Sequence, residues 1–390
     1  MRELIINKKE NVENIILLDN YKLIEYYTNT EEEKARRLEG NIYIAEVKDV
    51  INGMQAAFVE FGDHVKGFIH LKDSYPQIDQ TKHRIDENIK INDILKPKQK
   101  ILVQIKKDSD KKKGARVSTH ISLPGRYIVL MPNTDIITIS KKIESENDRK
   151  KLISLIKTKL PNNFGVVVRT SCLNASSEEI EKDLSKLLAL WNQIQNKYNK
   201  NKDKNVLIWE SENIPQKIIT DLGESNIDKI VLNNKEEYEK YKTEYKSIEV
   251  IYENMDLIEK YDLNNQIEKI RDRKIWLNCG AFITIDKTEA LTAIDVNTGK
   301  FTGKDNLEST LFKVNKEATT EIAKQLRLRD IGGIIIIDYI DMKNQENKNK
   351  ILELLAELLK NDRAKTQIEG FTKLNLMELT RKHICSHINT

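Results

Sequence analysis

Two strongly hydrophobic segments of this chain each run into acidic residues. The first, Glu289–Asn297, contains Asp295, and the second, Gly333–Asp341, contains Asp338 directly after four consecutive isoleucines. Two carboxylates that converge on one point would make an oxygen-rich site for Mg²⁺, an ion that binds one or two carboxylates together with water and phosphate oxygens. The pattern therefore predicts a magnesium site at Asp295 and Asp338.

Each aspartate taken alone has a simpler interpretation, because an acidic residue that closes a strand is commonly a turn former or the N-cap of the next helix. The occurrence of two such residues favours chemistry. Asn297, two residues after Asp295, is suited to orient a phosphate or a metal-bound water. Asp341 is either a third ligand or a loop residue, and we favour the loop.

The elements around the two aspartates must bring them together. The residues from Leu307 to Arg329 have a helical pattern, and the order strand, helix, strand predicts a right-handed crossover between parallel strands. If these strands are neighbours, both aspartates lie at the carboxyl edge of the sheet, where open α/β sheets bind ligands. The run of isoleucines predicts that the strand before Asp338 is buried on both faces.

Composition limits the classes of protein that fit. A length of 390 residues predicts about two to four domains, and a net charge of only +4 gives local basic runs more weight than the total. No stretch approaches the ~20 apolar residues of a membrane span, and the N-terminus has too short an apolar core for a signal peptide. We expect a cytoplasmic protein with no membrane partner, whose three cysteines are reduced thiols.

Short strands dominate the first third of the chain. The first 30 residues predict strands with a hairpin turn at Asp19-Asn20. From Asn41 to Ile105, short strands separated by glycine turns suit a small five-stranded OB-fold barrel. A second strand-rich unit extends from Ile121 to about Trp209 and includes a helix from Ser176 to about Tyr198.

Two aromatic residues, Phe58 and Phe68, fall on neighbouring strands of the predicted barrel. OB-folds stack single-stranded bases on such residues, although an isolated phenylalanine in a strand is more often part of a core. The basic run Lys106–Arg116, which includes Lys107 and Lys113, supplies positive charge for phosphate contacts. Together these features predict binding of RNA or single-stranded DNA.

Arg169 and Thr170 close another predicted strand. A guanidinium beside a hydroxyl fits a terminal phosphate, because arginine forms paired, charge-assisted hydrogen bonds. A surface salt bridge is an equally good interpretation of this arginine.

The chain resembles the ribonuclease E/G family, and the G branch of that family more closely than the E branch. The resemblance extends in order along nearly the whole chain, and its last three segments are long and specific. The segments that carry it are Asn41–Tyr43, Gly53–Val59, Ile121–Gly125, Val168–Thr170, Glu289–Gly299, Ile322–Gly333 and Ile337–Met342.

This resemblance implies a fold of several α/β and β domains. An RNase H-like domain (1–35 and 215–278) would be interrupted by an OB-fold RNA-binding domain (36–118) and a 5′-sensor domain (119–214). A DNase I-like α/β catalytic domain (279–390) would follow.

The resemblance also implies roles for individual residues. Asp295 and Asp338 would hold Mg²⁺, with Asn297 in the same site. Three residues would grip the RNA strand near the scissile bond: Phe58, Phe68 and Lys113. Four residues match the pocket for a 5′-monophosphate: Gly125, Val129, Arg169 and Thr170.

Two positions depart from the family pattern. Lys365 stands where the family has a further arginine of the 5′-phosphate pocket, and lysine keeps the charge without the two-pronged geometry, so we expect a weaker monophosphate preference. The family's Cys-Pro-x-Cys zinc link is absent after Arg381.

We therefore expect no zinc, and a weakened homodimer, since the family shares that zinc between subunits. The alternative ligands His383, Cys385 and His387 are too few for a zinc site, which normally has four.

The predicted activity is Mg²⁺-dependent endonucleolytic cleavage of single-stranded RNA, in which a metal-activated water attacks the phosphodiester. The resemblance implies stimulation by a 5′-monophosphate, a preference for A/U-rich sites, products with 5′-phosphate and 3′-hydroxyl ends, and a role in RNA processing and decay. Two other classes are open: a non-catalytic RNA-binding or scaffold protein, and a nuclease that acts on DNA.

Overall fold

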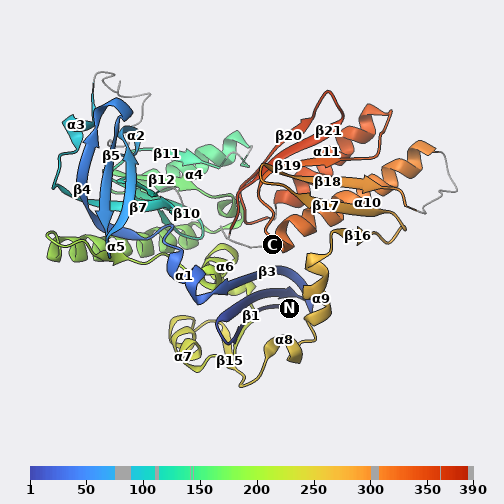
Figure 1. Ribbon diagram of the computed structural model, residues 1–390, viewed down its shortest axis with the longest axis horizontal. Coiled ribbons are helices and arrows are strands. Elements are labelled where there is room, and N and C mark those ends of the chain that lie inside the picture. Colours follow the sequence, from blue (N-terminus) through green and yellow to red (C-terminus); the bar gives the residue numbers. More distant parts are fainter. Residues whose placement is uncertain are drawn as a thin grey trace. The chain divides into compact units, whose positions relative to one another are not determined.

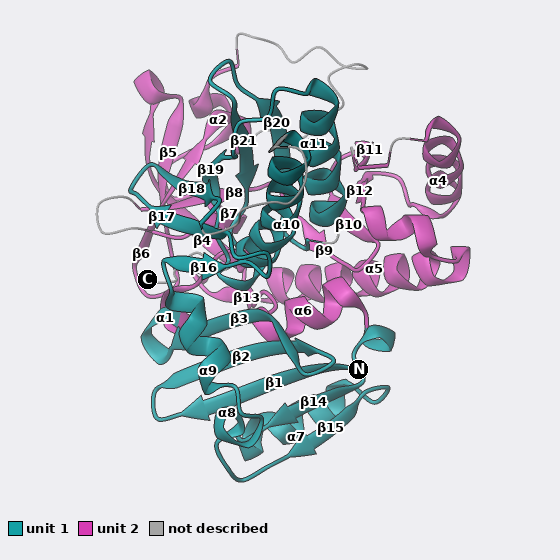
Figure 2. Cartoon of the chain, turned by 90° about the vertical axis from the view of Figure 1, so that its right-hand side faces the viewer, with its two compact units in different colours: residues 1–33, 224–390 teal, residues 34–223 magenta. Residues whose placement is uncertain are grey.

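Two compact units make up the chain, unit 1 from residues 1–33 and 224–390 and unit 2 from residues 34–223 (Figure 2). The computed structural model describes residues 1–74, 89–109, 114–140, 142–143, 145–299, 307–360 and 362–384. Within these residues the chain is a mixed α/β protein with four sheets (Figure 1). Helix α1 (Glu31–Arg36) lies where the chain first passes from unit 1 to unit 2.

The first sheet of unit 1 joins distant parts of the chain. Its N-terminal strands are antiparallel, and the predicted hairpin is present, with positive φ at Asn20 and Tyr21 (49° and 64°), as tight two-residue turns require. Two later strands add to β1 in parallel, with α7 (Lys235–Glu244) crossing between them. In sheet order the strands are β15 (Glu249–Tyr252), β14 (Lys229–Leu232), β1 (Arg2–Lys9), β2 (Val12–Asp19) and β3 (Lys22–Thr30).

The second sheet of unit 1 carries the two aspartates. β18 and β19 are parallel neighbours joined by α10 (Leu307–Leu328), so the predicted crossover is confirmed. The other strand pairs of this sheet are antiparallel. In sheet order the strands are β16 (Lys274–Trp276), β17 (Phe282–Lys287), β18 (Leu291–Asn297), β19 (Gly333–Asp338), β21 (Leu376–Arg381) and β20 (Thr366–Phe371).

Helices α10 and α11 (Gln345–Lys360) cover one face of this sheet. Ile322 and Leu355 from the helices pack with Ile294 and Ile337 from the strands, and all four side chains are buried. The opposite face has no such cover, since Ile334 of β19 is 51% exposed. The prediction that this strand is buried on both faces is therefore wrong. The isoleucines alternate between a core and an open face because the helices lie on one side only.

A buried ion-pair network lies where β19 begins and β21 ends. Arg381, 2% exposed, donates from Nε to Oδ2 of Asp362 (2.7 Å) and from Nη1 to Oδ1 of Asp330 (2.7 Å). Asp330 follows α10 and Asp362 follows α11, so the network fastens the ends of both helices to the sheet. The next residue, Arg363, pairs with Glu25 of β3 (2.6 Å), which links the two sheets of unit 1.

Unit 2 contains a closed barrel of five strands, as the spacing of short strands predicts. β4 pairs with both β5 and β7, which closes the barrel, and β13 (Leu207–Trp209) adds beside β4. The barrel strands are β4 (Ile42–Ile51), β5 (Ala56–Phe61), β6 (Val65–His70), β8 (Ala115–Ser118) and β7 (Lys100–Lys107).

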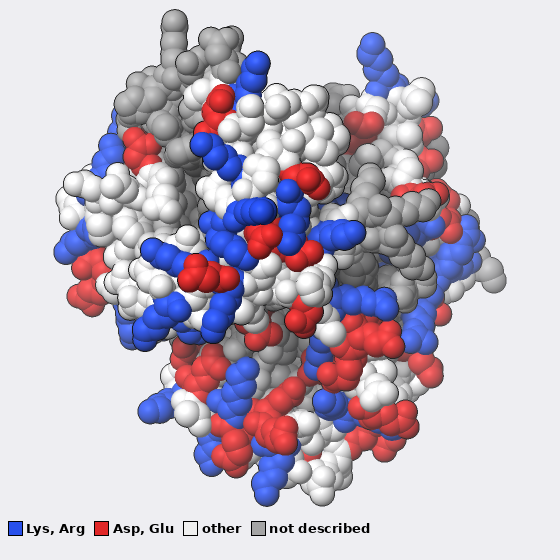
Figure 3. Space-filling model, turned by 60° about the vertical axis from the view of Figure 1, so that its left-hand side comes forward, with Lys and Arg blue, Asp and Glu red and all other residues white. Residues whose placement is uncertain are grey.

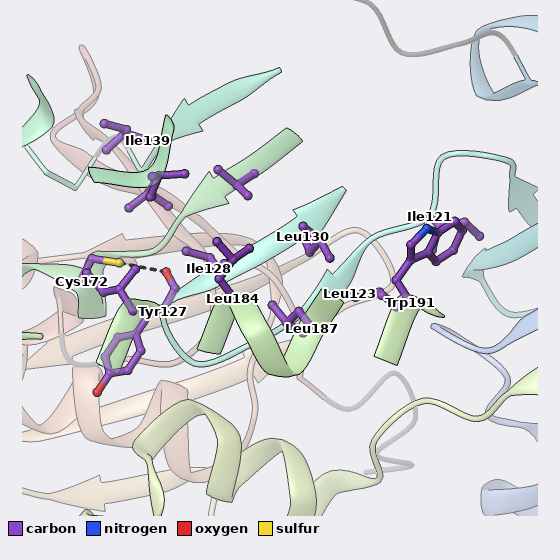
Figure 4. Packing of buried hydrophobic residues seen from close by; sticks show 14 of the residues in the cluster. Ile121, Leu123, Tyr127, Ile128, Leu130, Ile139, Cys172, Leu184, Leu187 and Trp191 are labelled. Carbon is purple, nitrogen blue, oxygen red and sulfur yellow. Dashed lines mark hydrogen bonds between the residues drawn. The ribbon is translucent and has the colours of Figure 1, made fainter. Parts of the chain in front are cut away.

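The second sheet of unit 2 packs against a long helix, α5 (Ser177–Lys200). Ser176 caps this helix in a capping box with Glu179, and the predicted helix is confirmed. Leu184, Leu187 and Trp191 of α5 lie against the sheet in the core shown in Figure 4. In sheet order the strands are β11 (Ile137–Ile139), β12 (Phe164–Val168), β10 (Ile128–Pro132) and β9 (Leu123–Pro124).

The remaining helices are short or peripheral. They are α2 (Leu71–Ser74), α3 (Ile91–Ile94), α4 (Glu146–Lys159), α6 (Ile214–Leu222), α8 (Leu257–Lys260) and α9 (Asn264–Glu268). Across the described parts of the chain, no helix has both the length and the apolar character that crossing a membrane requires.

The Arg381 network gives a stability prediction. Arg381→Ala would leave two carboxylates buried without their partner, and we expect this to cost about 3–5 kcal/mol of unfolding free energy. The measurement is native-state hydrogen exchange of the β19 and β21 amides. Arg273→Ala, which breaks an Arg273–Asp286 pair with 69% and 46% exposed side chains, is the matched control and should change stability far less, because solvent screens an exposed pair. Equal losses in both variants would contradict the prediction.

Candidate active site and nucleic-acid interface

The register of the second sheet of unit 1 places Asp295 directly opposite Asp338. They are Cα partners in the parallel β18–β19 pair, where neighbouring strands lie roughly 4.8 Å apart. Opposite residues point to the same face, and both aspartates are exposed on the open face, away from α10 and α11. The structure thus brings together the two carboxylates that the sequence singles out.

The surroundings of the pair leave two negative charges facing each other. Burial, and after it the charges of Asp295 and Asp341, raise the pKa of Asp338 above its ordinary value. Asn297 donates a hydrogen bond from Nδ2 to Oδ2 of Asp295 (2.6 Å), which fixes the orientation of that carboxylate. Asp341 lies in the loop after β19 and accepts a hydrogen bond from Asn375 (2.8 Å), in keeping with a loop role.

These residues fit Mg²⁺ better than a metal held by a closed set of protein ligands. In the described part of the chain, neither Asp295 nor Asp338 forms an ion pair with a lysine or arginine. The described part of the chain also contains no group of three or more His, Cys, Asp or Glu side chains that could hold a metal ion. Two carboxylates on an open face match the preference of Mg²⁺ for few protein ligands and several water or phosphate oxygens.

Of the three alternative zinc ligands near residue 385, only His383 is among the described residues. Nδ1 of His383 lies 2.9 Å from the backbone oxygen of Asp330. Cys385 and His387 lie outside the described residues.

An aromatic and basic row crosses the outer surface of the unit 2 barrel. Phe58 pairs with Phe68, Phe68 with Arg116, and Arg116 with Lys107 across β5, β6, β8 and β7. The two phenylalanine rings lie 5.6 Å apart, and Phe58 is 42% exposed, which excludes a core role for it. We call these four residues the barrel row.

The barrel row includes one residue that sequence reasoning did not single out, Arg116. Its Nε and Nη2 donate to Oδ2 of Asp73 (3.1 and 2.8 Å), which holds the guanidinium beside Phe68. Alternation in β8, where Ala115 and Val117 are buried, could have shown that Arg116 faces outward. Lys113, predicted for the same site, lies outside the described residues.

The predicted 5′-phosphate residues of unit 2 gather at the ends of β10 and β12. Arg169 donates from Nη1 to the oxygen of Gly125 (2.6 Å) and pairs through Nη2 with Asp221 (2.6 Å). Thr170 follows, with Oγ1 3.1 Å from the hydroxyl of Ser140. The salt-bridge interpretation of Arg169 is therefore confirmed, and binding of a terminal phosphate at this position stays a prediction.

Gly125 is required by a close approach. The carboxylate of Asp183 accepts hydrogen bonds from the backbone amides of residues 126, 127 and 128 (3.3, 2.9 and 3.2 Å). A Cβ at position 125 would lie 2.6 Å from Oδ2 of Asp183, so a side chain there would displace this support.

Two further residues of the predicted pocket are on other elements. Val129 lies on β10 and pairs with Pro124 and Val167, one row beyond the loop. Lys365 belongs to unit 1, where it is exposed just before β20.

We call Arg169, Thr170 and their partners Gly125, Ser140 and Asp221 the Arg169 cluster. A half-buried acid, Glu212, lies near it. Burial raises the pKa of Glu212 to about 7, against the opposing effect of a hydrogen bond from Thr220 (2.7 Å). The charge of Asp221 raises this pKa further, and that of Arg169 lowers it. No sequence pattern marks Glu212, because its burial depends on how α6 folds back.

Charge on the face of the molecule drawn in Figure 3 is mixed. Lysine and arginine side chains alternate with aspartate and glutamate across the face shown in Figure 3. The clusters described above therefore carry more information than the net charge.

Comparison with known proteins shows which family the chain belongs to. A model of the ribonuclease E/G family matches residues 122–384 of the chain. Ribonuclease G of Haemophilus influenzae is 36% identical over 391 residues, which cover 97% of this chain and 79% of that protein. The chain belongs to the ribonuclease E/G family. Ribonuclease E of Buchnera aphidicola subsp. Schizaphis graminum is 32% identical over 100% of this chain and 41% of that protein.

Solved structures add nothing to the assignment of this family member. A Streptococcus pneumoniae multidomain protein with nucleic acid binding domains covers 45% of the chain at 11% identity, with a TM-score of 0.17, which is too low to support an argument.

Glu212 gives a pH prediction. Its folded pKa of about 7 lies above its ordinary value of 4.5. Its contribution to stability is therefore fully present below about pH 4.5 and is lost as the pH rises through about 7. Glu212→Gln, which keeps an acceptor for Thr220, should flatten the fall of the unfolding temperature between pH 5 and pH 8. The exposed Glu210→Gln is the control and should keep the wild-type slope. An unchanged slope in Glu212→Gln would show that this carboxyl does not titrate in that range.

Proposed function

We propose that the chain is a Mg²⁺-dependent endoribonuclease that cleaves single-stranded RNA at the face carrying Asp295 and Asp338. Its class, an endoribonuclease, follows from its membership of the ribonuclease E/G family. The observation that supports the site is the register of β18 and β19, which sets two carboxylates side by side on an open sheet face. Two like charges that have no basic partner among the described residues are suited to a divalent cation.

The chain's own residues would prepare the site. Asp295 and Asp338 would hold the ion, and Asn297 would keep Asp295 oriented through its hydrogen bond. When bound there, Mg²⁺ supplies Lewis-acid chemistry that activates water and neutralises charge on the phosphate. Hydrolysis would break the bond between phosphorus and the 3′-oxygen, leaving a 5′-phosphate and a 3′-hydroxyl.

The barrel row supports the choice of single-stranded RNA as substrate. Exposed aromatic rings stack unpaired bases, and Arg116 and Lys107 in the same row provide charge for the backbone. A duplex would keep its bases stacked on each other and unavailable to these rings. This row suits substrates in RNA processing and decay that contain unpaired segments.

The Arg169 cluster supports stimulation by a 5′-monophosphate. Arginine and a hydroxyl next to a backbone loop can donate several hydrogen bonds to a terminal phosphate. The salt bridge to Asp221 pre-orients the guanidinium. Since Lys365 replaces a second arginine, we expect the preference for monophosphorylated ends to be modest.

The first test removes one carboxylate at a time. Asp295→Asn and Asp338→Asn should each lower the cleavage rate by roughly 10³-fold or more, because a catalytic metal supplies several kcal/mol. Affinity for a single-stranded RNA should remain within a few-fold of wild type. Chelation should abolish wild-type cleavage, and added Mg²⁺ should restore it.

The control for this test is Asp286→Asn, an exposed aspartate of the same sheet, which should remain active. The same sequence made as DNA should resist cleavage. Full activity of either site variant would overturn the assignment, and binding without any Mg²⁺-dependent cleavage by the wild type would favour a scaffold role.

The second test concerns the 5′ end. Arg169→Lys and Thr170→Val should reduce the ratio of cleavage rates on 5′-monophosphate and 5′-hydroxyl RNA by roughly 10-fold, since a charged hydrogen bond is worth about 1.5–3 kcal/mol. Arg116→Lys in the barrel row is the matched control and should slow both substrates equally. A ratio that stays at the wild-type value in both pocket variants would exclude this pocket as the sensor.

A further inference from the structure

An exposed aromatic cluster lies on the same open sheet face as the acidic pair. Alternation in β16 turns Ile275 towards the core and leaves Lys274 and Trp276 on the open face, where Trp276 is 58% exposed. The indole contacts the ring of Phe282, with centroids 5.2 Å apart and planes inclined at 61°. Nζ of Lys274 lies 4.1 Å from the indole centroid and 3.6 Å from the phenyl centroid. We call these three residues the β16 cluster.

The strand register connects this cluster to the acidic pair in two adjacent rows. In one row Trp276 is opposite Phe282, and Phe282 is opposite Asn297. In the next row Lys274, Thr284, Asp295 and Asp338 are successive partners across four strands. With roughly 4.8 Å between strands, the Trp276 backbone is about 10 Å from that of Asn297. All these side chains share one face, because opposite residues point the same way.

The β16 cluster has the chemistry of a nucleotide platform. Exposed aromatic rings stack unpaired bases of any identity, and a lysine beside them offers charge to the phosphate. A purely structural role explains the lysine over the rings as a cation–π contact, but it does not explain why a tryptophan is exposed on the same sheet face as the two carboxylates. The charge of Lys274 also favours RNA as the occupant. RNA is a polyanion, and a strand that reaches the acidic pair would be attracted by this lysine in the same row.

We propose that Lys274, Trp276 and Phe282 bind a nucleotide of single-stranded RNA next to the phosphodiester that lies over Asp295 and Asp338. This inference rests on the proposed function, because the nucleotide is the one adjoining the bond to be cleaved. The β16 cluster is a second stacking site, in unit 1, that works in addition to the barrel row of unit 2. Stacking tolerates any base, so the cluster contributes affinity and position rather than base choice.

The main experiment measures binding in an Asp338→Asn background, so that the RNA stays intact. The probe is a fluorescent, single-stranded, A/U-rich RNA with a 5′-hydroxyl, which does not engage the Arg169 cluster. Trp276→Leu, which keeps apolar area but lacks a π face, should weaken binding roughly 5- to 100-fold. Trp276→Phe should stay close to the parent. Lys274→Gln should reduce the slope of log Kd against log salt by about 0.7, the value of one phosphate contact on a single strand.

A matched control exists in the same unit. Tyr238 of α7 has Nζ of Lys242 5.2 Å from its ring centroid, and its ring lies 5.7 Å from that of Tyr252 in β15, so this site reproduces a lysine over paired rings away from the acidic pair. Tyr238→Ala should leave RNA affinity and the salt slope unchanged. RNA should also quench tryptophan fluorescence in the parent but not in Trp276→Phe, a readout that requires no destabilising change.

Active chains carrying only the cluster substitutions separate this inference from the proposed function. Trp276→Leu should raise KM with little change in kcat. Wild-type KM and affinity in Trp276→Leu would overturn the inference, while loss of cleavage in Asp338→Asn would still support the acidic pair. Full activity of Asp338→Asn would overturn the proposed function, whereas the affinity measurements would still decide whether the cluster binds RNA. A changed mass in solution with unchanged RNA affinity would make the face a contact between copies of this chain and also overturn the inference.

Discussion

The pairing register of β18 and β19 is the constraint on which the proposed chemistry of this protein depends. Side chains alternate along a strand, so a slip of one residue would send one aspartate into the core and leave the other alone. Several features hold the register. The crossover helix α10 fixes the length of the connection, Ile294 and Ile337 must face the helices, and Arg381 fastens the ends of both helices to β21. The packing on one face thus sets the geometry of the other.

The same principle organises the two proposed RNA-binding surfaces. In each unit, aromatic rings from paired neighbouring strands lie beside a basic side chain. The barrel row and the β16 cluster are alike in composition although they belong to unrelated sheets. Rows of this kind are stable in the absence of a ligand, because the backbone ladder positions them. Their rings therefore need little ordering when a strand binds.

Much of this arrangement could be predicted from sequence because it depends on local patterns. The helix before Gly333, the helix that Ser176 caps and the paired aspartates all follow from periodicity and order along the chain. Features that depend on tertiary packing could not be predicted. Four successive isoleucines do not indicate which face of the sheet lacks helices. Trp276 stands alone in the sequence, and its contact with a second aromatic ring follows only from the pairing of β16 with β17. The burial of Glu212 likewise arises from contacts within the fold.

The interrupted construction of unit 1 has a consequence for biosynthesis. The backbone amide of Arg2 in β1 donates a hydrogen bond to the carboxylate of Asp228, which comes 226 residues later in the chain. Glu25 of β3 pairs with Arg363, which comes 338 residues later. Domains generally fold as they emerge from the ribosome, so the barrel and its neighbouring sheet can complete their contacts while the first three strands still lack their partners. The face that carries the two aspartates forms after the barrel. If the proposed roles hold, a nascent chain would therefore bind RNA before it could cleave it.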